Sequence, residues 1–215
     1  MKALLLVDLQ NDFMPLGALA VSKGDQILPF VKELVQYPFD VIVATKDWHP
    51  PDHCSFASNH PNSCIGEVVE VAGVPQKLWP NHCIQGTFGA EFAPGFDTTY
   101  LDRIFYKGTE RYVDSYSAFF NNSGQLSTGL EKYLKDKNIQ ELFVAGLATD
   151  YCVKNSVLDA ISLGFKTYVI SEACRGVNVD ARDSHAAFAV MQTAGATFVP
   201  FQKLEEILKV KDRAL

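Results

Sequence analysis

The segment that decides the fold is Leu142-Phe143-Val144-Ala145-Gly146-Leu147-Ala148, which is followed by a helical pattern from Asp150 to Leu163. The first seven residues are apolar without alternation, which is typical of a strand that is covered on both faces. Gly164 follows the helical pattern at the position where a helix-ending glycine fits. A buried strand that leads into a helix is the repeating unit of a parallel α/β sheet.

The same unit recurs along the chain. Apolar runs predict five further strands, at 3–8, 41–47, 103–107, 166–171 and 197–200. Helical patterns occupy about 25–36, 126–137 and 180–193, with Asp25 as the N-cap of the first and Gly195 after the last. This order predicts the α/β class: a six-stranded, mainly parallel sheet, doubly wound as a three-layer α/β/α arrangement.

Two segments interrupt this alternation of strands and helices. Residues 48–102 have no strong period and are rich in Pro, His, Cys, Asn and Gly, and residues 108–124 form a shorter interruption. A segment as long as the first inside a compact domain is usually functional. Because no repeat, low-complexity tract or linker divides the chain, we expect residues 1–215 to form one domain with a long excursion at 48–102.

Composition excludes several classes of function. The net charge of −6 argues against binding a nucleic-acid backbone, which takes clustered Lys and Arg. The apolar run after Met1 ends at Asp8, which is too short for a signal peptide, and no stretch approaches the roughly 18 apolar residues of a membrane span. Five cysteines without a CxxC pair indicate reduced thiols. We therefore expect a cytoplasmic protein with no nucleic-acid or membrane partner.

Three polar residues lie at the carboxyl ends of predicted strands, where open α/β sheets bind ligands. Asp8 closes the first strand, Lys107 closes the third, and Cys152 begins the helix after the fourth. A thiol at a helix start loses its proton more easily, and a nearby lysine favours both thiolate and carboxylate. Asp8 would then accept the thiol proton and return it to a leaving amine. The three residues together favour a thiol hydrolase.

Each residue also has a structural interpretation. Cys152 fits a small buried core residue, Lys107 a lysine that extends to solvent at a sheet edge, and Asp8 a carboxylate that caps a loop. A Cys–His dyad using one of the five histidines is a further alternative, and sequence spacing alone does not decide among these interpretations.

A second cluster contains carboxylate and imidazole groups. Asp47 and His49 lie two residues apart at a strand end, and His53 and His82 follow in the long excursion. Such donors suit one Zn²⁺, Mn²⁺ or Fe²⁺ ion with open coordination positions. The alternative is a set of surface-loop histidines without a metal ion.

The remaining cysteines and histidines have no role that the sequence assigns. A structural zinc site would need the cysteines near the histidines, but the paired spacing of a closed four-ligand site is missing. The residues left unassigned are Cys54, Cys64, Cys83, Cys174, His60 and His185.

Six motifs in order make the chain resemble the nicotinamidases (pyrazinamidases) among the isochorismatase-like cysteine hydrolases, nearly from end to end. They are Leu6-Val7-Asp8-Leu9-Gln10-Asn11-Asp12-Phe13, Asp47-Trp48-His49-Pro50, Trp79-Pro80-Asn81-His82-Cys83, Lys107-Gly108, Val113-Asp114-Ser115-Tyr116-Ser117-Ala118-Phe119 and Gly146-Leu147-Ala148-Thr149-Asp150-Tyr151-Cys152-Val153. The resemblance implies the isochorismatase-like hydrolase fold, with the six strands in the order 3-2-1-4-5-6.

The resemblance also implies roles for single residues. The catalytic triad of the family falls on Asp8, Lys107 and Cys152. Its metal ligands fall on Asp47, His49 and His82, and His53 matches a position that ligates the metal in some members only. A cis peptide is implied between Leu147 and Ala148, with the amides of Ala148 and Cys152 forming the oxyanion hole. The ring-binding positions of the family fall on Phe13, Leu19, Trp79 and Tyr116.

The activity implied by the resemblance is hydrolysis of nicotinamide to nicotinate and ammonia through a cysteine thioester, in NAD salvage. One divalent metal ion, Zn, Mn or Fe, is the implied cofactor, and pyrazinamide is a second implied substrate. Two rivals remain: a hydrolase of the same fold acting on another small amide, a carbamoyl compound or isochorismate, and a metal-binding or interaction module without activity. The sequence leaves open whether the protein is a monomer or a homo-oligomer.

Overall fold

The computed structural model describes residues 1–208. Its main sheet contains β1 (Lys2–Val7), β2 (Val41–Asp47), β5 (Arg103–Lys107), β6 (Glu141–Leu147), β7 (Lys166–Arg175) and β8 (Thr197–Phe198). These strands lie in the order β5-β2-β1-β6-β7-β8, and every neighbouring pair is parallel. Counted along the chain, this is the expected order 3-2-1-4-5-6.

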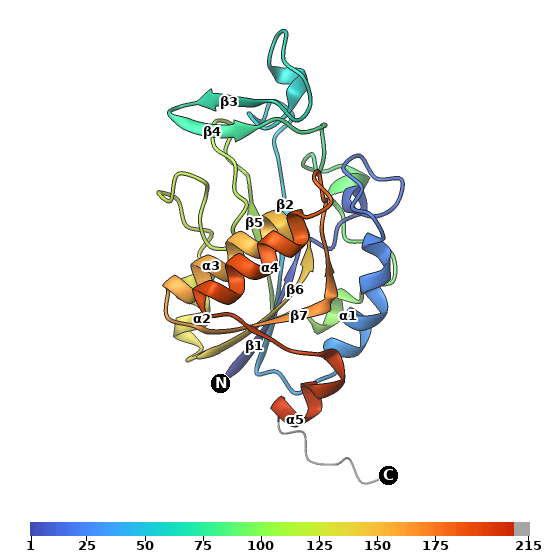
Figure 1. The fold of residues 1–215 in the computed structure, drawn as a ribbon, viewed down its shortest axis with the longest axis vertical. Helices are drawn as coiled ribbons and strands as arrows, with labels where there is room; N and C mark the ends of the chain where they lie inside the picture. Colours follow the sequence, from blue (N-terminus) through green and yellow to red (C-terminus); the bar gives the residue numbers. More distant parts are fainter. Residues whose placement is uncertain (209–215) are drawn as a thin grey trace.

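Helices cover both faces of the sheet, as the apolar strands predicted. Figure 1 shows α2 (Leu130–Asp136), α3 (Lys154–Ser162) and α4 (Asp183–Ala194) on one side, and α1 (Leu28–Leu34) on the other. Alternate side chains of β1 divide between the two cores: Leu4 and Leu6 pack with α1 and with α5 (Leu204–Leu208), while Leu5 packs with α2, α3 and α4. The three-layer α/β/α class is confirmed.

The strands agree closely with the sequence prediction, and β7 differs most. The bounds of β2 and β5 are those expected, whereas β7 continues to Arg175 instead of ending at residue 171. Its pairing with β6 shifts in register between Val144 and Gly146 and resumes at Cys174. The irregularity breaks the apolar run that marked the strand, so sequence analysis ended it too early.

Three helix starts were predicted too early, and α4 is one of them, since it begins at Asp183 instead of residue 180. Asp25 is not an N-cap, because it lies inside a 3₁₀ turn, Gly24–Ile27, whose N-cap residue is Lys23. The predicted helix at 126–137 begins only at Leu130, because Ser127 forms an isolated β-bridge with Phe120. The glycines expected after two helices were predicted correctly, since both have positive φ.

The long excursion contains structure that the sequence did not reveal. An antiparallel hairpin of β3 (Val68–Val71) and β4 (Val74–Lys77) projects beyond the carboxyl ends of the main strands (Figure 1). Each of its strands has four residues, and the only one of these that is buried is the polar Gln76, so the apolar pattern that marks core strands is missing. Within residues 1–208, none of the helices has the length and apolar character that crossing a membrane requires.

We predict that Gly146→Ala strongly destabilises the fold. Gly146 pairs with Val7 and has φ +128, and an added Cβ would lie under 3.0 Å from backbone atoms of Val7. Positive φ and backbone overlap should together cost about 3 kcal/mol or more, measured by urea unfolding.

Gly164→Ala is the matched control. Gly164 also has positive φ, but a Cβ there meets open space, so only about 1 kcal/mol should be lost. Equal losses in the two variants would show that contact with β1 does not constrain Gly146.

Candidate active site

Four neighbouring strands each deliver one polar group to the same edge of the sheet. Lys107 ends β5, Asp47 ends β2, Asp8 follows β1 with φ +50, and Cys152 lies in a π-helical turn, Thr149–Val153, after β6. All four residues are buried, with Cys152 only 7% exposed. The structure therefore brings together the three strand-end residues singled out in the sequence and adds Asp47 to them.

Lys107 is the centre of this cluster. Its Nζ lies 2.9 Å from Asp8 Oδ2 and 3.3 Å from Cys152 Sγ, and it forms an ion pair with Asp47 Oδ1. It also donates a hydrogen bond of 3.0 Å to the carbonyl of Ser115. Lys107 is 1% exposed, so the alternative of a lysine reaching solvent at the sheet edge is excluded.

The electrostatics favour an ammonium at Lys107 and a thiol at Cys152. Burial works to lower the pKa of Lys107, but the carboxylates of Asp47 and Asp8 outweigh it and raise that pKa well above its usual value. Burial raises the pKa of Cys152 well above that of a free thiol, although Lys107 opposes the change. The expected acidification of the thiol is therefore wrong for the resting site, because burial outweighs the lysine.

Asp8 has the properties of a proton acceptor. Burial raises the pKa of Asp8 to about 6, against the opposing effect of Lys107. Carboxylate oxygens of Asp8 and Asp47 and the sulfur of Cys152 lie within 4.8 Å of one another, and no histidine belongs to that group. A carboxylate with a pKa near neutrality suits reversible proton transfer. The geometry favours an Asp–Cys pair over a Cys–His dyad.

Thr45 fixes the position of Asp8. The Thr45 hydroxyl donates a hydrogen bond of 2.6 Å to Asp8 Oδ1 and accepts one of 3.2 Å from the Asp8 amide. Both residues are fully buried. Sequence analysis did not identify Thr45, although a lone hydroxyl near the end of an apolar strand is a feature that could have done so.

Asp47, His49 and His82 form a donor set for a metal ion. The Nε2 atoms of His49 and His82 lie 3.6 Å and 3.9 Å from Asp47 Oδ2. The Nδ1 atoms of these histidines lie 2.8 Å from the carbonyls of Gly108 and Pro80, respectively. Such contacts place the ring proton on Nδ1 and leave Nε2 free to bind a metal ion. The donor atoms lie within 4.8 Å of one another, so the residues fit a divalent ion.

Protonation affects these donors unequally. Burial lowers the pKa of His82 to about 4, so its ring is neutral. Burial would also lower the pKa of His49, but the Asp47 carboxylate outweighs burial and raises that pKa. Burial would raise the pKa of Asp47, yet Lys107 and His49 together hold it well below its usual range. The Asp47 carboxylate is therefore ionised, and a proton at His49 would compete with a metal ion.

His53 lies beside this set. Its ring stacks on His49 with centroids 4.1 Å apart, and its Nδ1 lies 2.7 Å from Ser55 Oγ. Its buried Nε2 has no hydrogen-bond partner among the described residues. It forms a second potential donor group with His49 and Asp114 rather than with Asp47.

The other cysteines and histidines lie outside this donor set. The side chain of His60 contacts the Cys54 carbonyl, and His185 is exposed on α4. All five cysteines are free thiols, and Cys152 is the only one in a potential metal group of residues 1–208. The structural zinc alternative therefore has no support in the described chain.

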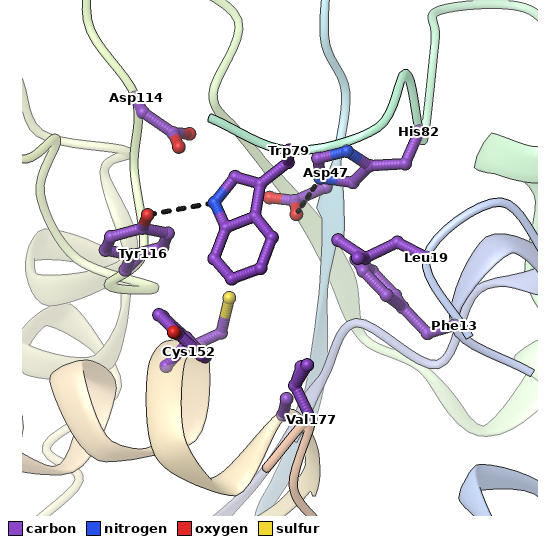
Figure 2. Close-up of a pocket in the computed structure, with 11 residues that line it drawn as sticks. Phe13, Leu19, Asp47, Trp79, His82, Asp114, Tyr116, Cys152 and Val177 are labelled. Atoms are coloured by element: carbon purple, nitrogen blue, oxygen red, sulfur yellow. Dashed lines mark hydrogen bonds and ion pairs between the residues drawn. The ribbon is translucent and has the colours of Figure 1, made fainter. Parts of the chain in front are cut away.

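Residues of both clusters, among them Cys152, Asp47 and His82, line one pocket. Figure 2 shows the Trp79 indole in its centre, donating a hydrogen bond of 3.0 Å to the Tyr116 hydroxyl, with Cys152 on one side and His82 on another. The residues that line it are Phe13, Leu19, Asp47, Trp79, His82, Asp114, Tyr116, Ala148, Tyr151, Cys152 and Val177. All four ring-binding positions expected from the sequence belong to this lining.

The turn before Cys152 has the backbone that the sequence resemblance implied. The Leu147–Ala148 peptide is cis. The Ala148 carbonyl accepts hydrogen bonds of 3.1 Å from the amides of Tyr151 and Val153, so the chain curls tightly around the cysteine. Ala148 and Cys152, the expected oxyanion-hole residues, both line the pocket.

Three pocket residues were missed by sequence analysis. Asp114 and Tyr151 lie inside motifs quoted above but were given no role. The hairpin reaches both of them, because Gln76 donates to Asp114 Oδ2 at 3.2 Å and Lys77 Nζ lies 3.2 Å from the Tyr151 hydroxyl. Val177 was missed because the prediction ended its strand at residue 171, which concealed that it follows a strand end.

Comparisons with known proteins agree with this geometry. The model of the family described as Isochorismatase domain matches residues 2–202. A curated nicotinamidase from Escherichia coli is 46% identical over 208 residues, which cover 95% of this chain and 97% of that protein.

Solved structures give the same result. A nicotinamidase/pyrazinamidase from Acinetobacter baumannii superimposes with a TM-score of 0.91 at 42% identity, covering 94% of this chain and 97% of the other. A Pyrococcus horikoshii pyrazinamidase, solved in complex with zinc, has a TM-score of 0.75 at 35% identity, covering 93% and 98%.

We predict that Lys107→Met destabilises the metal-free protein more than Asp8→Asn does. Loss of the ammonium leaves buried Asp8 without a charged partner and Asp47 with only its histidines, which should cost about 3–5 kcal/mol. Asp8→Asn keeps the Lys107–Asp47 ion pair and should cost less. Urea unfolding in the presence of a chelator measures both. If Lys107→Met were as stable as the parent, the buried charges would not depend on the lysine.

Proposed function

Because this chain belongs to the isochorismatase family, we propose that it is an amidohydrolase of NAD salvage that hydrolyses nicotinamide to nicotinate and ammonia. The residues of its pocket indicate how the reaction proceeds. The observation that carries the proposal is the shared pocket, in which Cys152 lines the same space as Asp47 and His82. Lys107 contacts Cys152 and forms an ion pair with Asp8. A thiol nucleophile with a carboxylate base suits amide hydrolysis, and the nearby donor set suits a heteroaromatic ring.

The first step is attack by the thiol. Asp8 takes the proton from Cys152 as the sulfur bonds to the carboxamide carbon, because a carboxylate of raised pKa lies close to that thiol. Lys107 stays protonated and stabilises the negative charge as it moves from Asp8 toward sulfur. We assign the backbone amides of Ala148 and Cys152 to the developing oxyanion.

The next steps return the proton and release the acid. Asp8 gives its proton to the leaving nitrogen, so that ammonia departs and a nicotinoyl thioester remains on Cys152. Asp8, now ionised again, takes a proton from water as the water oxygen attacks the thioester carbon. Collapse of that adduct breaks the carbon–sulfur bond as Asp8 returns the proton to sulfur, and the released nicotinic acid loses its remaining proton to solvent as nicotinate.

Asp47, His49 and His82 would hold one divalent ion, Zn, Mn or Fe, and His53 is a possible further ligand. When bound, the metal ion would act as an electrophile that anchors the ring nitrogen. Phe13, Leu19, Trp79 and Tyr116 would enclose the ring, as apolar and aromatic faces suit a flat heterocycle.

Further properties extend the proposal. We propose that pyrazinamide is also hydrolysed, since it differs from nicotinamide by one ring nitrogen. Residues 1–215 would act as one domain whose excursion at 48–102 supplies metal and substrate contacts. The five free thiols support a cytoplasmic location. We expect the enzyme to act as a monomer or a homo-oligomer.

We predict that Cys152→Ala abolishes ammonia release from nicotinamide. Loss of the nucleophile should reduce kcat by about 1,000-fold or more in assays with added Mn²⁺ or Zn²⁺. Cys64→Ala, which removes an exposed thiol, is the control and should retain parental activity. A Cys152→Ala variant as active as the parent would mean that the nucleophile is another residue. A parent protein with no turnover would overturn the proposed function itself.

We predict that dialysis against a chelator removes activity and that Mn²⁺ or Zn²⁺ restores it. His82→Ala should bind metal more than about 100-fold more weakly, since a direct ligand contributes more than an outer-shell partner, measured by calorimetry and by elemental analysis of the purified protein. His185→Ala, at an exposed position on α4, should bind metal like the parent. Full activity and unchanged nicotinamide affinity after complete metal removal would contradict the ligand assignment.

A further inference from the structure

We propose that Asp150 is a positioning residue that holds Val177 as one wall of the ring pocket, and that Val177 limits which ring substituents enter. The inference rests on the proposed function, because it concerns the substrate of that same pocket. It adds a residue pair whose effect is on substrate choice rather than on bond cleavage.

Both oxygens of the Asp150 carboxylate accept hydrogen bonds from the backbone of one loop. Asp150 is 4% exposed, its Oδ1 accepts a hydrogen bond of 2.9 Å from the Val177 amide, and its Oδ2 accepts one of 2.7 Å from the Asn178 amide. Among residues 1–208 it forms no ion pair with a lysine, arginine or histidine. A buried carboxylate satisfied by two amides fixes their positions strongly, because losing either bond leaves a charge undersolvated.

The loop is also held from its other end. Residues 176–178 follow β7 directly, and Asn178 Oδ1 accepts a hydrogen bond of 2.9 Å from the Ser184 amide in the first turn of α4. Gly176 packs so closely that a side chain there would meet Ser184 and Asp150. Val177 is therefore fixed between two anchors.

Val177 presents only methyl groups to the pocket. Figure 2 shows its side chain pointing into the pocket from the side on which Cys152 lies. An apolar branched side chain cannot select a substrate by hydrogen bonding, so its influence is through size. Because Asp150 lies two residues before Cys152, one turn sets the position of both the sulfur and this wall. The spacing between the attacking atom and the wall is thus fixed by Asp150.

The test is the substrate preference of the metal-loaded enzyme. The probes are nicotinamide and the four nicotinamides methylated at ring carbon 2, 4, 5 or 6, and the readout is each kcat/KM relative to that of nicotinamide. This ratio does not depend on the fraction of active enzyme, so a general loss of stability leaves it unchanged. Val177→Ala should raise the ratio about tenfold for at least one methylated amide.

Asp150→Asn should raise the ratio for that same amide by about threefold, because the amide side chain keeps one acceptor and loses the other. The double variant should match Val177→Ala alone, since Asp150 acts through Val177. Asn178→Ala removes the hydrogen bond between the loop and α4 and should shift the ratio in the same direction. It replaces Asp150→Asn as the test if that variant does not fold.

Asp183→Asn is the matched control. Its carboxylate also accepts a backbone amide near the start of α4, that of Asp180, but it does not hold Val177. It should leave every ratio at the parental value. Unchanged ratios in Asp150→Asn or in Val177→Ala would overturn the inference while leaving nicotinamide hydrolysis intact. Failure of the parent enzyme to hydrolyse nicotinamide would instead overturn the proposed function.

Discussion

The site depends on one constraint: the ammonium of Lys107 lies fully inside the protein and must be matched there. A buried charge is tolerated only with partners, and each partner comes from a different strand end. Along the adjacent strands β5, β2, β1 and β6, the sheet supplies Lys107, Asp47, Asp8 and, just beyond β6, Cys152. The sheet order is therefore also the spatial order of the reactive groups. Separating β5, β2 or β1 from its neighbours would remove a charged group from the cluster.

Asp47 connects the two halves of the pocket. One of its oxygens pairs with Lys107, and the other faces the Nε2 atoms of His49 and His82. A single carboxylate thus contributes to the balance of charge around the nucleophile and to the metal donor set. The two halves are electrostatically coupled, so a change in charge on the histidine side is felt by Lys107 and, through it, by Cys152.

Sequence alone predicted what repeats or what is confined to short motifs. Buried strands are continuous apolar runs, so five of the six, all but β7, were located to within about two residues, and polar residues at their ends indicated the site. The hairpin was missed because its strands pack against no core. Val177 was missed because β7 was ended too early, and Thr45 because the residue that it contacts, Asp8, lies on a neighbouring strand end. The resting thiol was misjudged because burial is a property of the folded chain.

The hairpin that reaches the pocket through Gln76 and Lys77 belongs to no layer of the main sheet. Its length and sequence can therefore vary during evolution without altering the strand ends that carry the nucleophile and its base. An insertion there would reshape the outer wall of the pocket while the buried charges stay in place. The wall of the pocket and its buried charges therefore belong to different parts of one fold, the hairpin and the ends of the main strands.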